Sequence, residues 1–168
     1  KTVSILEKPL ESSRPAEIPQ LSTSERIASA SKILMAYPDD EPARRVLIEA
    51  VVFAPDVEAS LAAYMLGTRG SGFQDVMTAL GEQLSARTGV ARVHMGEAML
   101  RLDGNHVTAT DSLIGMVSSS DPQIRMMAAF AMQAATGIQR DRCISTLIKL
   151  LQDKDSDVRA AAALALGG

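Results

Sequence analysis

Four stretches of the chain are versions of one another and recur at a nearly constant spacing. They read Val57-Glu58-Ala59-Ser60-Leu61-Ala62, Ala91-Arg92-Val93-His94-Met95-Gly96, Ile124-Arg125-Met126-Met127-Ala128-Ala129 and Val158-Arg159-Ala160-Ala161-Ala162-Ala163. Their first positions are 57, 91, 124 and 158, which differ by 34, 33 and 34. A nearly fixed period of this length is typical of a stacked array of repeats, in which each repeat contacts only its neighbours.

The pattern of apolar residues predicts an all-α chain. Apolar residues recur at helical spacing, no window alternates with a period of two, and the short connections favour antiparallel neighbours. We expect an N-terminal helix over about 25–36, followed by four helix pairs at about 41–67, 72–103, 109–136 and 140–168. Within the pairs, the expected helices are 41–53, 56–66, 72–86, 89–102, 109–118, 122–135, 140–152 and 157–166.

The segment 1–22 differs from this repeat domain, which we expect to span 23–168. It contains Pro9, Pro15 and Pro19, and prolines remove backbone donors and fix φ, so a helix or a central strand is not expected there. We interpret residues 1–22 as an extended arm or linker, either disordered or packed along the array or a partner. The anchors of a packed arm would be Val3, Ile5 and Leu6.

Composition and charge narrow the classes of partner. Only 3% of the residues are aromatic, there is no Trp, and the net charge is −3. A surface that binds nucleic acid needs stacking aromatics or a basic footprint, so we expect no nucleic-acid partner and disfavour a DNA-repair glycosylase. The chain has no run of about 18 apolar residues, so we expect no membrane-spanning helix.

The cysteine count bears on the compartment. Cys143 is the single cysteine, which excludes an intramolecular disulfide and fits a reducing compartment, so a cytoplasmic location is favoured. The chain begins at Lys1 rather than Met, which leaves open a cleaved leader or a piece of a longer protein.

Small residues on the second helix of each pair predict close stacking. The first apolar residue and the residues four and seven positions later fall on one stripe of the helix. Small side chains on that stripe would let neighbouring pairs approach closely and bury the shared face. In the last two units the stripe consists of Ile124, Ala128, Ala131, Val158, Ala162 and Ala165.

An arginine follows the first apolar residue in three of the units. These arginines are Arg92, Arg125 and Arg159, and Asp121 and Asp155 lie in the turns before two of them. We expect an Asp–Arg ladder between neighbouring turns, with the carboxylates also favouring the helix N-termini. The alternative is a basic stripe for an anionic ligand, which Glu58 in the first unit would interrupt.

The last units resemble a known family. The segment Cys143–Asp153, followed by Asp157-Val158-Arg159 and by Ala162-Ala163-Leu164-Ala165-Leu166-Gly167, resembles a HEAT repeat, and more narrowly the short HEAT-like type of phycobilisome lyases. The resemblance covers about residues 41–168 and weakens toward the N-terminus. It implies a right-handed α-α superhelix that acts as a protein-interaction scaffold without catalysis or cofactor. The alternative that it implies is a bilin lyase-like enzyme or a subunit of one.

Three features are candidates for chemical sites. The glycine-rich segment 67–72 lacks the preceding strand and the Lys-Ser/Thr pair of a phosphate-binding loop, so we expect a helix end and a linker. His94 and His106 are too few for a catalytic metal and are expected on a helix surface and in a loop. Cys143 is expected to be a small buried apolar residue; the alternative is a thiol activated at the start of a helix.

The second helices also carry the candidate partner surface. In HEAT-like arrays these helices line the concave side, and positions two and six after the first apolar residue would form an apolar groove there. Candidate residues are Val93, Glu97, Met126, Phe130 and Leu164. The alternative is that they pack between helices. The last helix is nearly all Ala and Leu after Arg159, so we expect its outer face to be covered by further repeats or by another copy of the chain.

Overall fold

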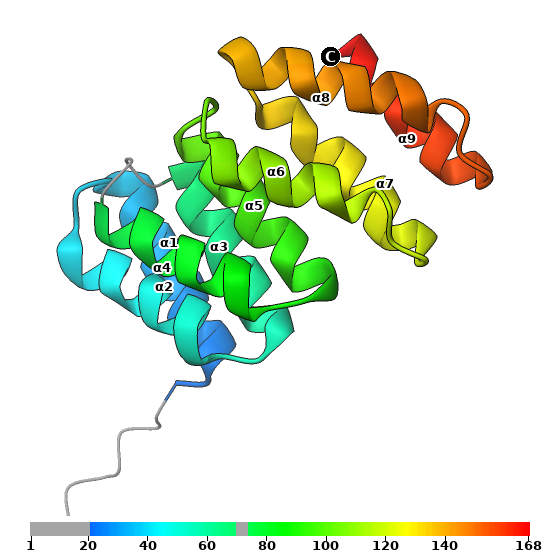
Figure 1. The fold of residues 1–168 in the computed structure, drawn as a ribbon. Helices are drawn as coiled ribbons and strands as arrows, with labels where there is room; N and C mark the ends of the chain where they lie inside the picture. The colour runs from blue at the N-terminus through cyan, green and yellow to red at the C-terminus, as the bar shows by residue number, and fades with distance from the viewer. Residues whose placement is uncertain (1–20, 70–73) are drawn as a thin grey trace, which may run out of the picture.

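The computed structural model describes residues 21–69 and 74–168, which form nine α-helices and one short 3-10 helix (Figure 1). The all-α prediction is confirmed, with four helix pairs and a preceding helix. The predicted arm, apart from Leu21 and Ser22, and residues 70–73 of the glycine-rich segment lie outside the described residues. The elements are α1 (Thr23–Ala36), α2 (Glu41–Phe53), α3 (Asp56–Arg69), α4 (Gln74–Ala86), α5 (Gly89–Leu102), α6 (Val107–Met116), α7 (Pro122–Ala131), η1 (Met132–Ala134), α8 (Gly137–Leu150) and α9 (Ser156–Gly167).

The helices are arranged in two layers. The first helices of the pairs, α2, α4, α6 and α8, form one layer, and the second helices, α3, α5, α7 and α9, form the other (Figure 1). Second helices of neighbouring pairs contact each other more extensively than first helices do. An array whose one layer is more closely spaced curves toward that layer, so the second helices lie on the concave side.

The helix starts correct the alignment of the first unit. The second helices begin at positions 56, 89, 122 and 156, and α1 begins at position 23, so successive starts differ by 33, 33, 33 and 34. Counted from these starts, Glu58 and not Val57 corresponds to Ala91, and Ala59 corresponds to Arg92. The alignment at Val57 was wrong because Val57 is an apolar residue that the fold leaves exposed. The helix α1 occupies the place of a second helix that lies before α3.

Caps determine most of the helix starts. Ser22 and Glu25 form a reciprocal capping box at α1, and Asp40 accepts a hydrogen bond from the N–H of Ala43 ahead of Pro42 in α2. Asp121 and Asp155 cap α7 and α9 through their side-chain oxygens. Such side-chain acceptors satisfy backbone donors that the first turn of a helix leaves without a partner.

Several predicted helix boundaries differ from the structure, by up to four residues. The helix α6 begins at residue 107 rather than 109, because Nδ1 of His106 accepts the N–H of Ala109 and caps the earlier turn. The helix α8 begins at residue 137 rather than 140, where Gly137 has a φ of 53° that lets the chain turn sharply into the helix. The helix α7 ends at Ala131, and the last predicted turn is the 3-10 helix η1.

Small residues on the second helices form part of the buried core. The predicted stripe is buried at Ala128, Ala131, Val158, Ala162 and Ala165, and Ile124 is half-buried. The closest approach is between α3 and α5, where a Cβ added at Gly67 would lie 2.8 Å from Cα of Ala98. Small side chains therefore hold the second-helix layer together by near contact of the backbones.

Candidate partner-binding surface

The predicted groove residues do not share one environment. Val93 is 1% exposed and packs in the core, so the prediction that it lines a groove is wrong. Val93, Gly96 and Leu100 recur at helical spacing and are all buried, so Val93 lies on a face of α5 that packs into the core. Met126 and Glu97 are half-buried, whereas Phe130 and Leu164 are 40% and 64% exposed.

Counting from the helix starts identifies the exposed row. Tyr64, Glu97, Phe130 and Leu164 each lie eight positions after the first residue of their helix. Tyr64 is 44% exposed, and on the same face of α3 Val57 and Leu61 are also exposed. We call Val57, Leu61, Tyr64, Phe130 and Leu164 the apolar face. Tyr64 is not among the predicted groove residues, because the predicted alignment of the first unit begins one residue early. The equal steps from Tyr64 to Glu97 and from Glu97 to Phe130 are the signal that locates it.

A groove lies on this face between α3 and α5. Its volume is about 560 Å³, and Val57, Leu61 and Tyr64 line its α3 side. Val90 and His94 line its α5 side. The walls are largely apolar with a few polar groups, which is the usual composition of a surface that receives a side chain from a binding partner.

A polar cluster borders the groove. Glu97 Oε1 accepts hydrogen bonds from Nε and Nη2 of Arg101, at 3.0 and 2.7 Å. The guanidinium carbon of Arg101 lies 5.8 Å from the ring centroid of Tyr64, within cation-π range. The His94 imidazole, with Nδ1 3.5 Å from Glu97 Oε2, and the Arg101 guanidinium hold the pKa of Glu97 below its usual value. This cluster ties α3 to α5 and fixes the orientation of Tyr64.

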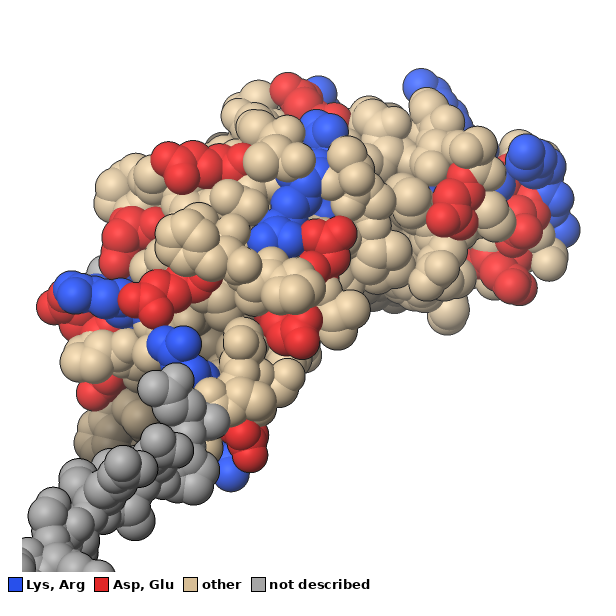
Figure 2. Space-filling model, turned by 90° about the horizontal axis from the view of Figure 1, so that it is seen from below, with Lys and Arg blue, Asp and Glu red and all other residues tan. Residues whose placement is uncertain are grey.

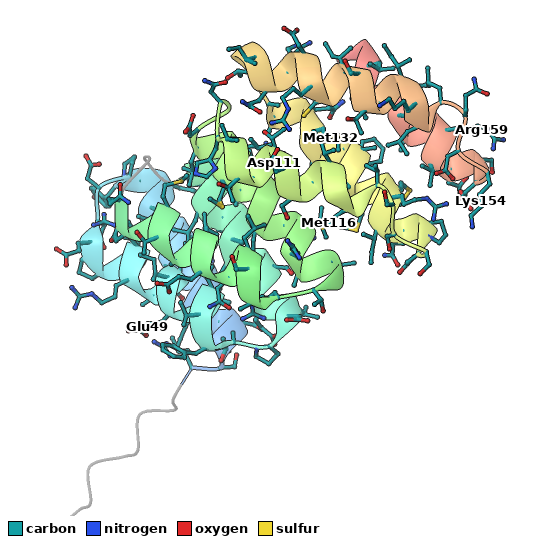
Figure 3. The ribbon with its side chains drawn as sticks, viewed as in Figure 1. Glu49, Asp111, Met116, Met132, Lys154 and Arg159 are labelled. Atoms are coloured by element: carbon teal, nitrogen blue, oxygen red, sulfur yellow. The ribbon has the colours of Figure 1, made fainter. Side chains whose placement is uncertain are left out.

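The opposite layer has a different surface. The exposed residues along the middle of the first helices are mainly polar or charged, and Figure 3 labels two of them, Glu49 on α2 and Asp111 on α6. The large apolar residues exposed in this layer lie elsewhere: Phe53, Val107 and Ile138 at helix ends, and Ile148 on α8 at the end of the array. Exposed apolar residues away from the helix ends therefore lie mainly in the second-helix layer, on α3, α7 and α9, and Glu97 of α5 interrupts them.

The predicted Asp–Arg ladder is wrong: of its three arginines only Arg125 binds a carboxylate among the described residues, and that carboxylate belongs to Asp153. Arg125 binds Asp153 with two parallel hydrogen bonds, Nε to Oδ2 at 2.9 Å and Nη2 to Oδ1 at 2.8 Å. Asp121 and Asp155, the predicted partners, instead cap helices, because their side chains reach the nearest free backbone N–H groups. The bonds to Asp153 raise the pKa of Arg125, and the same contact lowers the pKa of Asp153.

The other two arginines of the ladder have different partners. Arg92 donates from Nε to the hydroxyl of Ser112 at 3.0 Å. Arg159 donates from Nη1 to the carbonyl oxygens of Asp153 and Lys154. An arginine that the sequence analysis did not single out, Arg87, reaches back to the previous unit, where it pairs with Asp56 and donates to carbonyl oxygens at the end of α2.

The remaining candidate residues for chemistry, Cys143 and His106, have structural roles. Cys143 is in the middle of α8 and buried, and burial raises the pKa of its thiol to about 11. Activation at a helix start is therefore wrong for this cysteine, and its expected role as a buried apolar residue is confirmed. His106 is a helix cap, as described above. Across residues 21–69 and 74–168, no group of three or more His, Cys, Asp or Glu side chains could hold a metal ion.

Charge is distributed without a dominant patch on the face seen in Figure 2. A short run of basic side chains crosses the middle of that face with acidic side chains on either side, and no broad area of one sign is visible. A phosphate-binding footprint would appear as a basic patch or stripe. Within the described parts of the chain, no helix has both the length and the apolar character that crossing a bilayer requires.

Comparison with known proteins agrees with the geometry at the C-terminal end. A family model described as HEAT repeats matches residues 110–168, which contain α7, α8, α9 and most of α6. No curated protein is similar enough to this chain to count as a match. HEAT repeats commonly act as protein-interaction scaffolds and are generally non-enzymatic. The family match and the two-layered helical array together support a HEAT-like α solenoid.

Proposed function

We propose that this chain is a protein-binding scaffold whose binding site is the apolar face of the second-helix layer. The observation that carries the proposal is the contrast between the layers: apolar side chains are exposed along α3, α7 and α9, while the middles of the first helices are mainly polar. Exposed apolar surface rimmed by polar groups is characteristic of protein interaction sites.

The groove between α3 and α5 indicates the kind of contact. An aliphatic or aromatic side chain of the partner would enter the groove between Leu61 and Tyr64 on α3 and His94 on α5. The Glu97–Arg101 pair would provide polar contacts at the rim. Interfaces concentrate binding energy in a few such buried anchors. Tyr64 and Phe130 are the two aromatic residues of the face and are the anchors that we expect on this chain.

A pair of matched variants tests the proposal. The chain would be immobilised and used to capture partners from its native source, followed by mass spectrometry and affinity measurement with the purified partner. We expect Tyr64→Ser combined with Phe130→Ser to weaken that affinity by at least about 30-fold, because anchor residues each contribute about 1–2 kcal/mol or more.

Phe53→Ser is the control, since Phe53 is 83% exposed at the end of α2 and does not line the groove between α3 and α5. An equal loss of affinity in the control, or unchanged affinity in the folded double variant, would contradict the proposal. Thermal unfolding of all variants separates lost binding from lost folding. No feature of the described residues favours the bilin lyase-like alternative over the scaffold.

A further inference from the structure

The groove between α3 and α5 lies inside the array, between two second helices that are side by side (Figure 1). It is lined by the first halves of both helices, from Asp56 to Tyr64 on one side and from Gly89 to His94 on the other. A repeat added at either end of the array would leave this groove open. Its exposed apolar walls therefore need an occupant that is not simply the next repeat.

The sequence before α1 contains one run of adjacent aliphatic residues. Val3, Ile5 and Leu6 fall within residues 2–6, which contain no charged residue and no proline. The other Leu and Ile residues among positions 1–20 are Leu10 and Ile18, and each stands alone between a proline and a glutamate. Burial of neighbouring aliphatic side chains adds their contributions to binding. The run 2–6 is therefore the part of this segment that suits an apolar groove.

The segment joins the array at the edge where the groove lies. Leu21 and Ser22 precede α1, which packs beside α3 in the place of a second helix. The helices α1, α3 and α5 therefore run in the same direction and begin at one edge of the layer. Because neighbouring helices are about 8–10 Å apart, the groove lies about 15–20 Å from Leu21. Leu6 is 15 residues before Leu21, a length of chain that spans up to about 50 Å.

This short connection makes weak contacts sufficient. A tether of such length gives the run an effective concentration in the millimolar range at the groove. Burial of two aliphatic side chains corresponds to a dissociation constant near the same range. The run would therefore occupy the groove for about half of the time, and a partner that binds more tightly would displace it.

We infer that Val3, Ile5 and Leu6 bind in the groove between α3 and α5 of their own chain. In this position they cover Leu61 and Tyr64 and compete with the partner for them. The docking is argued from the groove and the tether alone, whereas the competition rests on the proposed function.

A spin label on the segment tests the docking without any partner. A nitroxide would be attached to the full chain through Ser4→Cys, since the only natural cysteine, Cys143, is buried. The amide NMR signals of Leu61 and His94, one on each wall of the groove, should lose most of their intensity. The signal of Ile33, which lines a pocket between α1 and α2, should keep its intensity.

A matched pair of variants tests the groove side of the contact. Leu61→Ser should restore the His94 signal, whereas Leu164→Ser, on the apolar face but outside the groove, should not. Both leucines are exposed, so neither change removes a core side chain. In a mixture of a spin-labelled chain and an isotope-labelled chain, the second chain should keep all its signals, because the contact lies within one chain.

A second pair of variants tests the other side of the contact. Ile5→Asp combined with Leu6→Asp should restore the signals of Leu61 and His94, whereas Leu10→Asp should not. With the purified partner, the same double change should raise the affinity about twofold, because it frees a groove that is otherwise occupied for about half of the time.

Four results would overturn the inference. They are full signals at Leu61 and His94, signal loss at Ile33 in their place, loss that persists in the Ile5→Asp, Leu6→Asp variant, and loss in the second chain of the mixture. The last result would assign the contact to another copy of the chain. If the segment docks but its double change leaves the partner affinity unaltered, the competition is refuted. If it does not dock, the inference fails and the proposed function still stands.

Discussion

Gly67→Ala tests the close packing of α3 against α5. A methyl group at this position would lie 2.8 Å from Cα of Ala98, closer than real Cβ contacts come, and 3.1 Å from its Cβ, which is tighter than most real contacts. The clashing atoms include backbone, so no change of rotamer relieves the clash, and α3 must move away from α5 by about half an ångström in a closely packed interface. Every side chain between the two helices would then lose contact.

The expected sign is opposite to that of an ordinary Gly→Ala change in a helix. Alanine would gain about 0.5–1 kcal/mol from lower backbone entropy, whereas overpacking costs about 1–3 kcal/mol. Because the clash is with backbone, we take the upper part of that range and expect a net destabilisation of about 1–2 kcal/mol. Gly81→Ala is the control, since its methyl group would meet only the terminal methyl of Met99, at an ordinary 3.7 Å.

Urea unfolding followed by far-UV circular dichroism measures both variants. We expect Gly81→Ala to shift the midpoint to higher urea and Gly67→Ala to shift it to lower urea. If Gly67→Ala is as stabilising as Gly81→Ala, the close approach of α3 and α5 is wrong, and so is the account of how small residues hold the layer together.

Three other predictions follow from single contacts. The Cys143 thiol should not react with a thiol reagent at pH 8 until urea unfolds the chain, because burial raises its pKa to about 11; rapid labelling of the folded chain would contradict this. Glu97 has a lowered pKa in the folded chain, so its contribution to stability is present above its usual pKa of 4.5 and is lost as the pH falls below that value. Glu97→Gln should therefore remove that part of the acid dependence of urea unfolding. Asp155→Ala should cost about 1 kcal/mol in the same urea assay through loss of the α9 cap, and an unchanged midpoint would show that the cap does not matter.

Most of the fold follows from local sequence signals. Helical periodicity and short connections located all the pairs, and α2 and α5 begin and end where the sequence predicts. These signals are reliable because a helix that buries one face repeats its apolar residues within a few positions. Two of the boundaries that shifted depend on His106 and Gly137, whose effects come from one hydrogen bond and one backbone angle rather than from a pattern.

The candidate surface was harder to predict than the fold. A repeat has two stripes of apolar residues, one that stacks and one that faces solvent, and composition alone does not separate them. For this reason Val93 was predicted on the exposed stripe and Val57 on the stacking stripe, whereas Val93 is buried and Val57 is exposed. The partner of Arg125 was also missed, because the acidic residues nearest in sequence, Asp121 and Asp155, are used as caps and the carboxylate that binds it lies in the next unit.

Site-specific photo-crosslinking tests the proposed binding surface most directly. A photoreactive amino acid would replace Tyr64 on the apolar face or Glu49 on the first-helix layer, and each variant would be illuminated in an extract of the native source. We expect position 64 to form a crosslink to one discrete partner protein, which an excess of the unmodified chain competes away, and position 49 to form none. A competed crosslink at position 49 with none at position 64 would place the partner on the opposite layer and contradict the account.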